Sequence, residues 1–154
     1  MTSAISGTRS LHRLVYASKI RVPEADLDYE VGQIIQASIR NNRGTSLTGL
    51  LLVHAGWFLQ ALEGPAGAVM TTYQRILNDT RHEESKTLAA GPVSAREFGD
   101  WNMCAARITP ADDAILDALA QRQVFDPSAL SAAAALRLLK TVRGIQQRQV
   151  GAAA

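Results

Sequence analysis

The sequence contains a single cysteine, Cys104, and only 5% of its 154 residues are aromatic. One cysteine excludes an internal disulfide and a zinc site built from several cysteines, and it is consistent with a reducing compartment. The chain also lacks a phosphate-binding loop, a glycine-rich dinucleotide fingerprint and a paired zinc-ligand motif. Its three histidines lie far apart in the sequence. A Ser-His-Asp triad could assemble from distant residues, but no G-x-S-x-G motif supports one. We therefore expect no metal centre and no hydrolytic site.

An excess of charge of one sign and a membrane-spanning segment are also missing. Sixteen basic residues against 14 acidic ones give a net charge of +2, so the pI near 9.0 reflects near balance and does not favour a nucleic-acid partner. Residues 1–10 are polar and lack the apolar core of a signal peptide. The longest uncharged stretch, 44–62, is interrupted by polar residues and by a turn at His54-Ala55-Gly56, which predicts a hairpin. We expect a cytoplasmic protein that does not contact a membrane.

Hydrophobic periodicity predicts the element order β-α-β-β-α-β-β. Strands are expected at 11–18, 47–53, 57–62, 86–98 and 101–108, and helices at 24–41 and 66–78. The second helix should turn five apolar side chains inward, namely Val69, Met70, Tyr73, Ile76 and Leu77. Pro92 indicates an edge or irregular strand. This order is typical of an α+β, ferredoxin-like sandwich with a five-stranded mixed sheet.

Two more helices are predicted after the last strand, at about 111–121 and 128–149. The second carries an apolar stripe, consisting of Leu130, Ala134, Leu138, Val142 and Ile145. These helices should cover the sheet face that the first two helices leave bare, or pair with another subunit to give a homo-oligomer. The chain is thus divided into an N-terminal extension (1–10), a globular domain (11–108), a C-terminal helical cap or output segment (109–150) and a flexible tail (151–154).

Several polar residues stand in apolar surroundings. Tyr16 lies inside a strand, and Gln60 lies in the run Phe58-Leu59-Gln60-Ala61-Leu62, where its amide needs partners for both its oxygen and its nitrogen. Each has an ordinary explanation alone: a core tyrosine with a satisfied hydroxyl, and an edge-strand glutamine that faces water. Asn41-Asn42 is by itself a helix stop, Arg81-His82 a solvated loop pair and Trp101 a core residue.

Taken together, these residues form a succession of short motifs. The motifs are Tyr16-Ala17-Ser18, Ser38 with Asn41-Asn42, Leu47-Thr48-Gly49, Phe58-Leu59-Gln60 with Leu62-Glu63-Gly64-Pro65, Asp79-Thr80-Arg81-His82, and Trp101-Asn102-Met103. In this order and spacing the chain resembles the BLUF family of blue-light sensors that use a bound flavin, over 11–108. Each motif is weak alone, but six in register with the predicted strands and helices are specific. The chain resembles the short, stand-alone type of this family.

The resemblance implies that FAD lies between the helices 24–41 and 66–78, although the sequence does not distinguish FAD from FMN or riboflavin. It implies that Tyr16 is the photochemical donor and that Gln60 lies between Tyr16 and the flavin. Further cofactor-binding residues implied in the same way are Asn42 and Asn41 at the polar edge of the ring, with Ser38, Arg81 and His82 nearby. Ile34 and Ile35 offer an apolar wall for a flat ring.

The resemblance also implies a mechanism without substrate turnover, so the chain is expected not to be an enzyme. Excited flavin would take an electron and then a proton from Tyr16, and Gln60 would relay the proton and change its hydrogen bonds, which shifts the spectrum to the red. The signal would leave through Trp101 and Met103 on the last strand, toward the C-terminal helices and an unidentified downstream protein.

Two other functions remain open at this point. A small, light-independent flavin oxidoreductase would need an open site for a donor and an acceptor. An RNA-binding ferredoxin-like module would need exposed aromatic residues with basic neighbours on adjacent strands, and Tyr16 and Phe58 lack the glycine-aromatic motif of such modules.

Overall fold

The computed structural model describes residues 10–42, 46–99, 102–107 and 126–153 of the chain. The strands are β1 (Leu11–Ile20), β2 (Thr48–His54), β3 (Trp57–Pro65), β4 (His82–Pro92) and β5 (Asn102–Arg107). The helices are α2 (Leu27–Asn42), α3 (Ala66–Leu77) and α5 (Ala132–Ala153), with short 3-10 turns η1 (Glu24–Asp26) and η3 (Pro127–Ala129). The predicted helix at 111–121 lies outside the described residues. The α+β class predicted from the sequence is confirmed.

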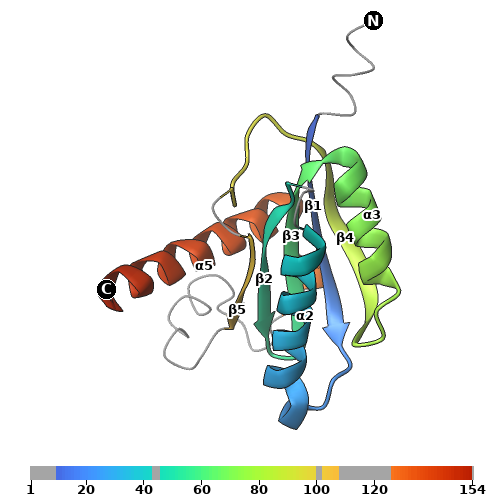
Figure 1. The fold of residues 1–154 in the computed structure, drawn as a ribbon, viewed down its shortest axis with the longest axis vertical. Coiled ribbons are helices and arrows are strands. Elements are labelled where there is room, and N and C mark those ends of the chain that lie inside the picture. Colours follow the sequence, from blue (N-terminus) through green and yellow to red (C-terminus); the bar gives the residue numbers. More distant parts are fainter. Residues whose placement is uncertain (1–9, 43–45, 100–101, 108–125, 154) are drawn as a thin grey trace, which may run out of the picture.

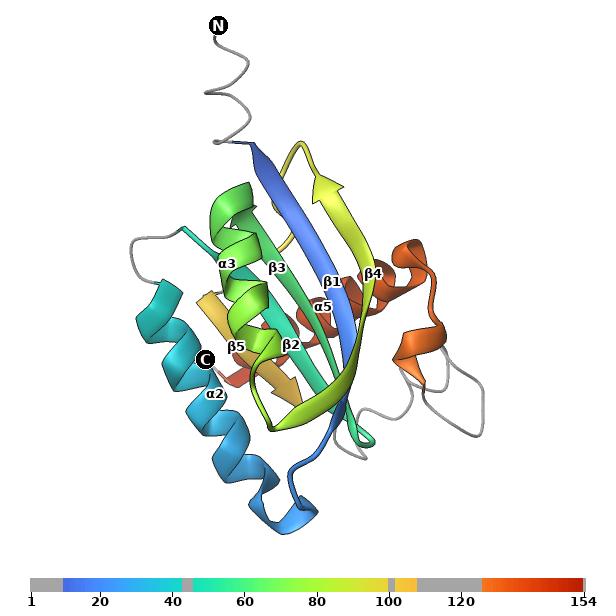
Figure 2. The ribbon, with the colours of Figure 1, turned by 90° about the vertical axis from the view of Figure 1, so that its right-hand side faces the viewer.

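The strands form one sheet in the order β4-β1-β3-β2-β5. The pairs β1–β4, β1–β3 and β2–β3 are antiparallel, whereas β5 runs parallel to β2. β4, which ends at Pro92, lies at an edge of the sheet, where a proline that donates no hydrogen bond is tolerated. Helices α2 and α3 lie on one face, and α5 crosses the other (Figures 1 and 2).

A two-residue turn joins β2 to β3. His54 and Trp57 are direct partners, and the two residues between them, Ala55 and Gly56, have φ values of 52° and 85°. Positive φ at both central positions is the mark of a hairpin turn whose twist matches that of its strands. The hairpin predicted from His54-Ala55-Gly56 is thus confirmed. No helix among the described ranges is long and apolar enough to cross a membrane.

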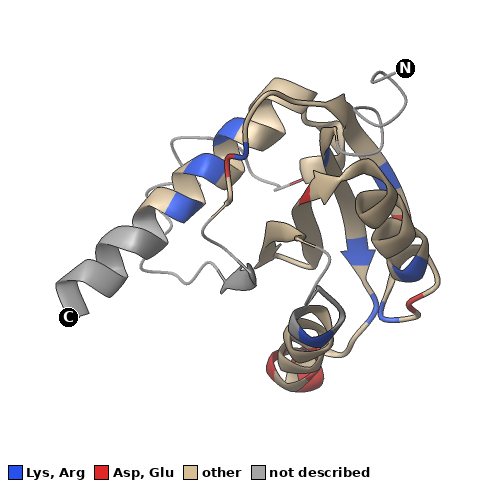
Figure 3. Cartoon of the chain, turned by 45° about the horizontal axis from the view of Figure 1, so that its top comes forward, with Lys and Arg blue, Asp and Glu red and all other residues tan. Residues whose placement is uncertain are grey.

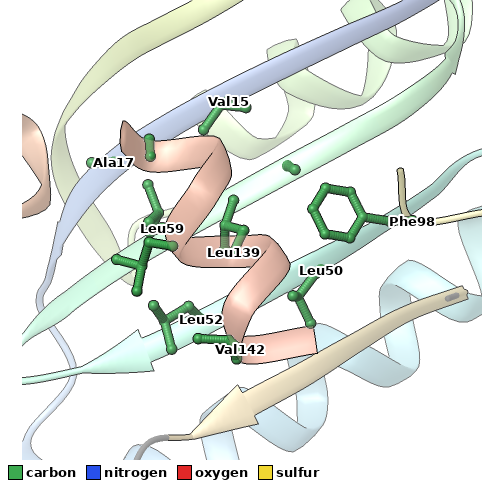
Figure 4. Packing of buried hydrophobic residues seen from close by; sticks show 11 residues of the cluster. Val15, Ala17, Leu50, Leu52, Leu59, Phe98, Leu139 and Val142 are labelled. Carbon is green, nitrogen blue, oxygen red and sulfur yellow. The ribbon is translucent and has the colours of Figure 1, made fainter. Parts of the chain in front are cut away.

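Side chains alternate between the two faces of the sheet, so each strand contributes to two apolar layers. On the α5 face the buried cluster contains Val15, Ala17, Leu50, Leu52, Leu59, Ala61 and Phe98 together with Ala135, Leu138, Leu139 and Val142 of α5 (Figure 4). On the α2 and α3 face, Tyr16 and Leu62 belong to one cluster, and Leu51 and Phe58 belong to another. Helix α5 therefore covers the face that α2 and α3 leave bare, which is one of the two arrangements expected from the sequence.

Several boundaries and faces differ from the prediction. β4 occupies His82–Pro92 and not 86–98, because its pairing with β1 extends to Ile20 opposite His82, and alternation alone does not mark where a partner strand ends. Helix α5 continues to Ala153, past the end expected near Gln149, because Gly151 does not end the helix and the two alanines after it are good helix formers.

The buried faces of α3 and α5 also differ from the faces predicted from the sequence. On α3, Val69 and Tyr73 are buried, but Met70 and Leu77 are about half exposed, because a sheet covers only a limited sector of a helix. On α5 the buried residues include Leu139, which the predicted stripe omitted, while Ala134 is only partly buried.

Candidate functional site

Tyr16 and Gln60 meet directly across the β1–β3 ladder. They are Cα partners in the antiparallel register, both are 3% exposed, and the Tyr16 hydroxyl donates a hydrogen bond to Gln60 Oε1. Because that oxygen can only accept, the amide Nε2 of Gln60 carries the donors that the pair presents to other groups. The pair is a buried donor–acceptor unit in the middle of the sheet.

The Tyr16 phenol is held in its protonated form. Burial raises its pKa well above the ordinary value of 10, and the neighbouring Tyr73 and Asp79 raise it further. The rings of Tyr16 and Tyr73 lie 5.3 Å apart between centroids, and the Tyr73 hydroxyl lies 2.9 Å from Ser85 Oγ and 3.1 Å from Thr87 Oγ1 on β4. Tyr16 therefore keeps its proton as a hydrogen-bond donor over the whole physiological range.

His82 connects the end of α3 to β1. Its Nε2 lies 2.7 Å from the carbonyl oxygen of Ile76, and its Nδ1 lies 2.7 Å from Oγ of buried Ser18. A carbonyl oxygen only accepts, so Nε2 carries a proton, and in the neutral ring Nδ1 accepts from the serine hydroxyl. The His82 ring lies 6.1 Å from that of Phe58 and 6.3 Å from that of Tyr16 between centroids. These contacts fix His82 as a wall of the site.

Asp79 and Arg81 form an ion pair in the turn that follows α3. The Arg81 side chain donates to Asp79 Oδ1 and Oδ2 at 2.7 to 3.2 Å, and the Arg81 backbone N–H donates to Oδ1 at 2.9 Å. Burial alone would raise the pKa of Asp79, but the hydrogen bonds from Arg81 outweigh it, with a smaller effect from His82, so that the pKa lies below its usual value. Both residues stay charged near neutral pH.

These side chains line a cavity between α2, α3 and the sheet. Its walls are Tyr16, Ile34, Ser38, Leu51, Phe58, Gln60, Ile76, Asp79, Arg81 and His82, and the hollow that they form is partly open to solvent. An adjoining hollow of about 600 Å³, part of it open to solvent, shares Ile34, Ser38, Gln60, Ile76, Asp79 and Arg81. Apolar walls with a few convergent polar groups are typical of small-molecule sites. Among the described residues no group of three or more acidic, His or Cys side chains could hold a metal ion.

Six of the residues singled out in the sequence line this cavity: Tyr16, Ser38, Ile34, Gln60, Arg81 and His82. Ile35 packs instead against the apolar clusters beneath α2 and α3. Asn41 and Asn42 belong to the last turn of α2, but their side chains lie outside the described structure.

The two residues predicted to carry the output signal, Trp101 and Met103, are only partly covered by the described structure. Trp101 is outside the described residues. Met103 lies in β5, where the register against β2 shifts by one residue between the pairs Gly49–Asn102 and Leu50–Cys104. Only its backbone is described.

Four wall residues were not assigned to the site from the sequence, namely Leu51, Phe58, Ile76 and Asp79, although Phe58 and Asp79 belong to the motifs quoted above. Two signals were available. Asp79 comes two residues before Arg81 directly after a helix, where an aspartate bonds the backbone of a turn, and Ile76 lies on the predicted inward stripe of that helix.

A family model and several known proteins match most of the sheet and the two helices on its cavity face. A family model described as "BLUF: Sensors of blue-light using FAD" matches residues 11–104. The photoactivated adenylate cyclase subunit beta of Euglena gracilis is 35% identical over 102 residues, and subunit alpha is 34% identical over 93 residues. These matches cover 66% and 60% of this chain but only 12% and 9% of the relatives, so the chain corresponds to a small part of each cyclase subunit.

Similar solved structures extend over most of the chain. A dark-state structure of BlrB, described as a BLUF protein, is 30% identical with a TM-score of 0.71 and covers 90% of this chain and 98% of that one. The photo-activated state of BlsA has a TM-score of 0.76 over 86% of this chain and 94% of that one. At 23% identity the second comparison supports the fold alone.

Proposed function

Because the chain belongs to the BLUF family of sensors of blue light that use FAD, we propose that it is a blue-light photoreceptor whose photochemistry is carried by Tyr16 and Gln60. The observation that carries this proposal is the buried hydrogen bond from the Tyr16 hydroxyl to Gln60 Oε1 at the wall of the cavity. Both residues lie within the region that the family model matches, 11–104.

The side chains that line the cavity suit a flavin ring. Ile34, Leu51, Phe58 and Ile76 provide apolar walls for a flat ring, and Gln60 and Ser38 provide polar atoms for its edge. We propose FAD as the cofactor. FMN and riboflavin are alternatives, because they carry the same ring and the side chains named here would contact only that ring. When bound, a flavin supplies a strong oxidant on absorption of blue light. We further propose that Asn41 and Asn42 contribute to the polar edge of the site.

Gln60 is the proposed acceptor of the proton that Tyr16 gives up when it loses an electron. The Tyr16 hydroxyl proton already points at Gln60 Oε1, and a phenol that has been oxidised releases its proton readily. The glutamine amide can accept this proton at Oε1 and release one from Nε2, so it relays a proton without net uptake. When the electron and a proton return to Tyr16, the amide is left in a rotated or tautomeric form. No substrate is consumed in these steps, so the chain is proposed to act as a sensor and not as an enzyme.

The test is an absorption spectrum of the purified chain in the dark, after blue light and during dark recovery. We expect a flavin spectrum with a small, reversible shift to the red. Tyr16→Phe should bind flavin and lose the shift, whereas Tyr29→Phe, at a tyrosine that is 68% exposed on α2, should retain it. A shift that survives Tyr16→Phe would contradict the mechanism. Bound flavin that oxidises NADH in the dark would favour an oxidoreductase, and a colourless protein that takes up no flavin would refute the flavin site.

We propose a cytoplasmic sensor, with residues 11–108 as the flavin-binding unit and the C-terminal segment as the output unit. The β-α-β-β-α-β-β order of the described elements supports the ferredoxin-like assignment. The signal is proposed to leave through Met103 and Trp101 toward a downstream protein, and the chain to act as a homo-oligomer. The cyclase subunits support the general form of this output, because in them a matching segment is a small part of a much longer chain.

A further inference from the structure

Glu63 is a fully buried carboxylate on the face of the sheet opposite the cavity. Arg13 Nε donates to it at 2.7 Å, and the backbone N–H groups of Glu97 and Phe98 donate at 2.9 and 2.8 Å. A buried charge is tolerated only where it is paired and hydrogen-bonded, and this one is satisfied on both oxygens. The two backbone donors belong to the loop 93–99 between β4 and β5, so Glu63 fastens this loop to β3.

The same loop is fastened to α5. Phe98 is fully buried in the cluster with Leu139 and Val142, and the Arg143 guanidinium carbon lies 5.5 Å from the centre of its ring. Arg143 also donates to the carbonyl oxygen of Glu97, and the carboxylate of Glu97 lies 3.6 Å from Arg143 and 3.7 Å from Lys140. Figure 3 shows the basic residues of α5 where the helix passes this loop.

A third contact ties the loop to the centre of the sheet. Arg96 Nη1 donates to Thr48 Oγ1 at 2.7 Å and to the carbonyl oxygen of Glu63 at 3.1 Å. Thr48 and Arg13 are the two Cα partners of Glu63 on either side of β3. Glu63 is therefore held from both neighbouring strands, and a displacement of β3 at this point reaches the loop through three hydrogen bonds.

We propose that Glu63 is a positioning residue that links β3 to α5: its carboxylate fixes 96–98, and this segment sets how α5 is docked. Gln60 lies three residues earlier on the same strand. A change in the hydrogen bonds of Gln60 that moves β3 is thus passed to α5 through Glu63, independently of β5. This second part rests on the proposed photoreceptor function, whereas the anchoring of α5 does not.

The test is hydrogen exchange of the backbone amides of residues 132–144, measured in the dark and under blue light. Glu63→Gln keeps the size of the side chain but removes its charge. It also replaces one accepting oxygen by an NH₂ group, so at least one of the three buried donors from Arg13, Glu97 and Phe98 loses its acceptor. We expect the variant to raise exchange in α5 by about tenfold in the dark. We also expect the light-induced change in α5 to be lost while the flavin red shift is retained. Glu84→Gln is the matched control, because this carboxylate is 60% exposed on β4.

Wild-type exchange of α5 in the Glu63→Gln variant would overturn the anchor. Loosening in the dark together with an undiminished light response would overturn the coupling. If the variant does not fold, the double variant Phe98→Leu, Arg143→Met weakens both contacts of the loop with α5, and unchanged α5 exchange in that variant would also refute the anchor. Should the wild-type chain show no light-induced absorbance change, the photoreceptor function fails, and the dark comparison still decides whether Glu63 anchors α5.

Discussion

Glu63 follows Gln60 by three residues on β3, and the two side chains point to opposite faces of the sheet. Across the ladder, Gln60 faces Tyr16 and Glu63 faces Arg13, so both pairs are formed by the same two strands. One pair lines the cavity beneath α2 and α3, and the other holds the loop that contacts α5. The central strands thus connect the candidate photochemical site to the C-terminal helix over a short distance along the chain.

Gln60→Leu is expected to bind flavin but to lose the reversible red shift. Leucine has a similar size, but it has neither the amide oxygen that accepts from Tyr16 nor the amide nitrogen that donates. The buried Tyr16 hydroxyl also loses its acceptor, which should lower the free energy of unfolding by about 1–3 kcal/mol. Difference spectra and urea unfolding measure the two effects. Gln74→Leu, at an exposed position of α3, should change neither, and a normal shift in Gln60→Leu would contradict the assignment.

The two residues of the hydrogen-bonded pair at the centre of the site could be identified from the sequence. Tyr16 and Gln60 stood out because each is a polar side chain inside an apolar strand, and strand periodicity placed both in the sheet. Their direct contact depends on the β1–β3 register, which a single sequence does not specify. Asp79 was missed for a related reason, since its function in the turn depends on hydrogen bonds to Arg81.

The hydrogen-bond partners of Glu63 could not be predicted from sequence patterns. Its partners Glu97 and Phe98 are 34 and 35 residues away, and they lie in a stretch that alternation assigned to a strand. The buried face of α5 was only partly predicted, because several neighbouring alanines and leucines fit more than one helical stripe and only docking on Leu50, Leu52 and Leu59 selects Leu139.

Asp79→Asn is expected to destabilise the chain at neutral pH but not in acid. The pKa of Asp79 in the folded state lies below its ordinary value of 3.8, so the stabilisation is present above that value and is lost as the pH falls through the folded-state pKa. Because both side chains are partly exposed, at 27% and 28%, the difference should be about 1 kcal/mol or less. Urea unfolding of both proteins from pH 3 to 7 measures it. A difference that widens below pH 4 would contradict the ion pair.

Leu139→Ala tests whether α5 belongs to the core in solution. Leu139 is fully buried against the sheet, so truncation to alanine should lower the free energy of unfolding by about 2–5 kcal/mol. Leu77→Ala is the matched control, because Leu77 on α3 is 46% exposed and should cost less than about 1 kcal/mol. The cavity lies on the other face of the sheet, and flavin binding at equal folded fraction should therefore be preserved in Leu139→Ala. Equal unfolding free energies of Leu139→Ala and the wild-type chain would show that α5 is not docked, and the contacts of Glu97 and Phe98 with α5 would then lose their basis.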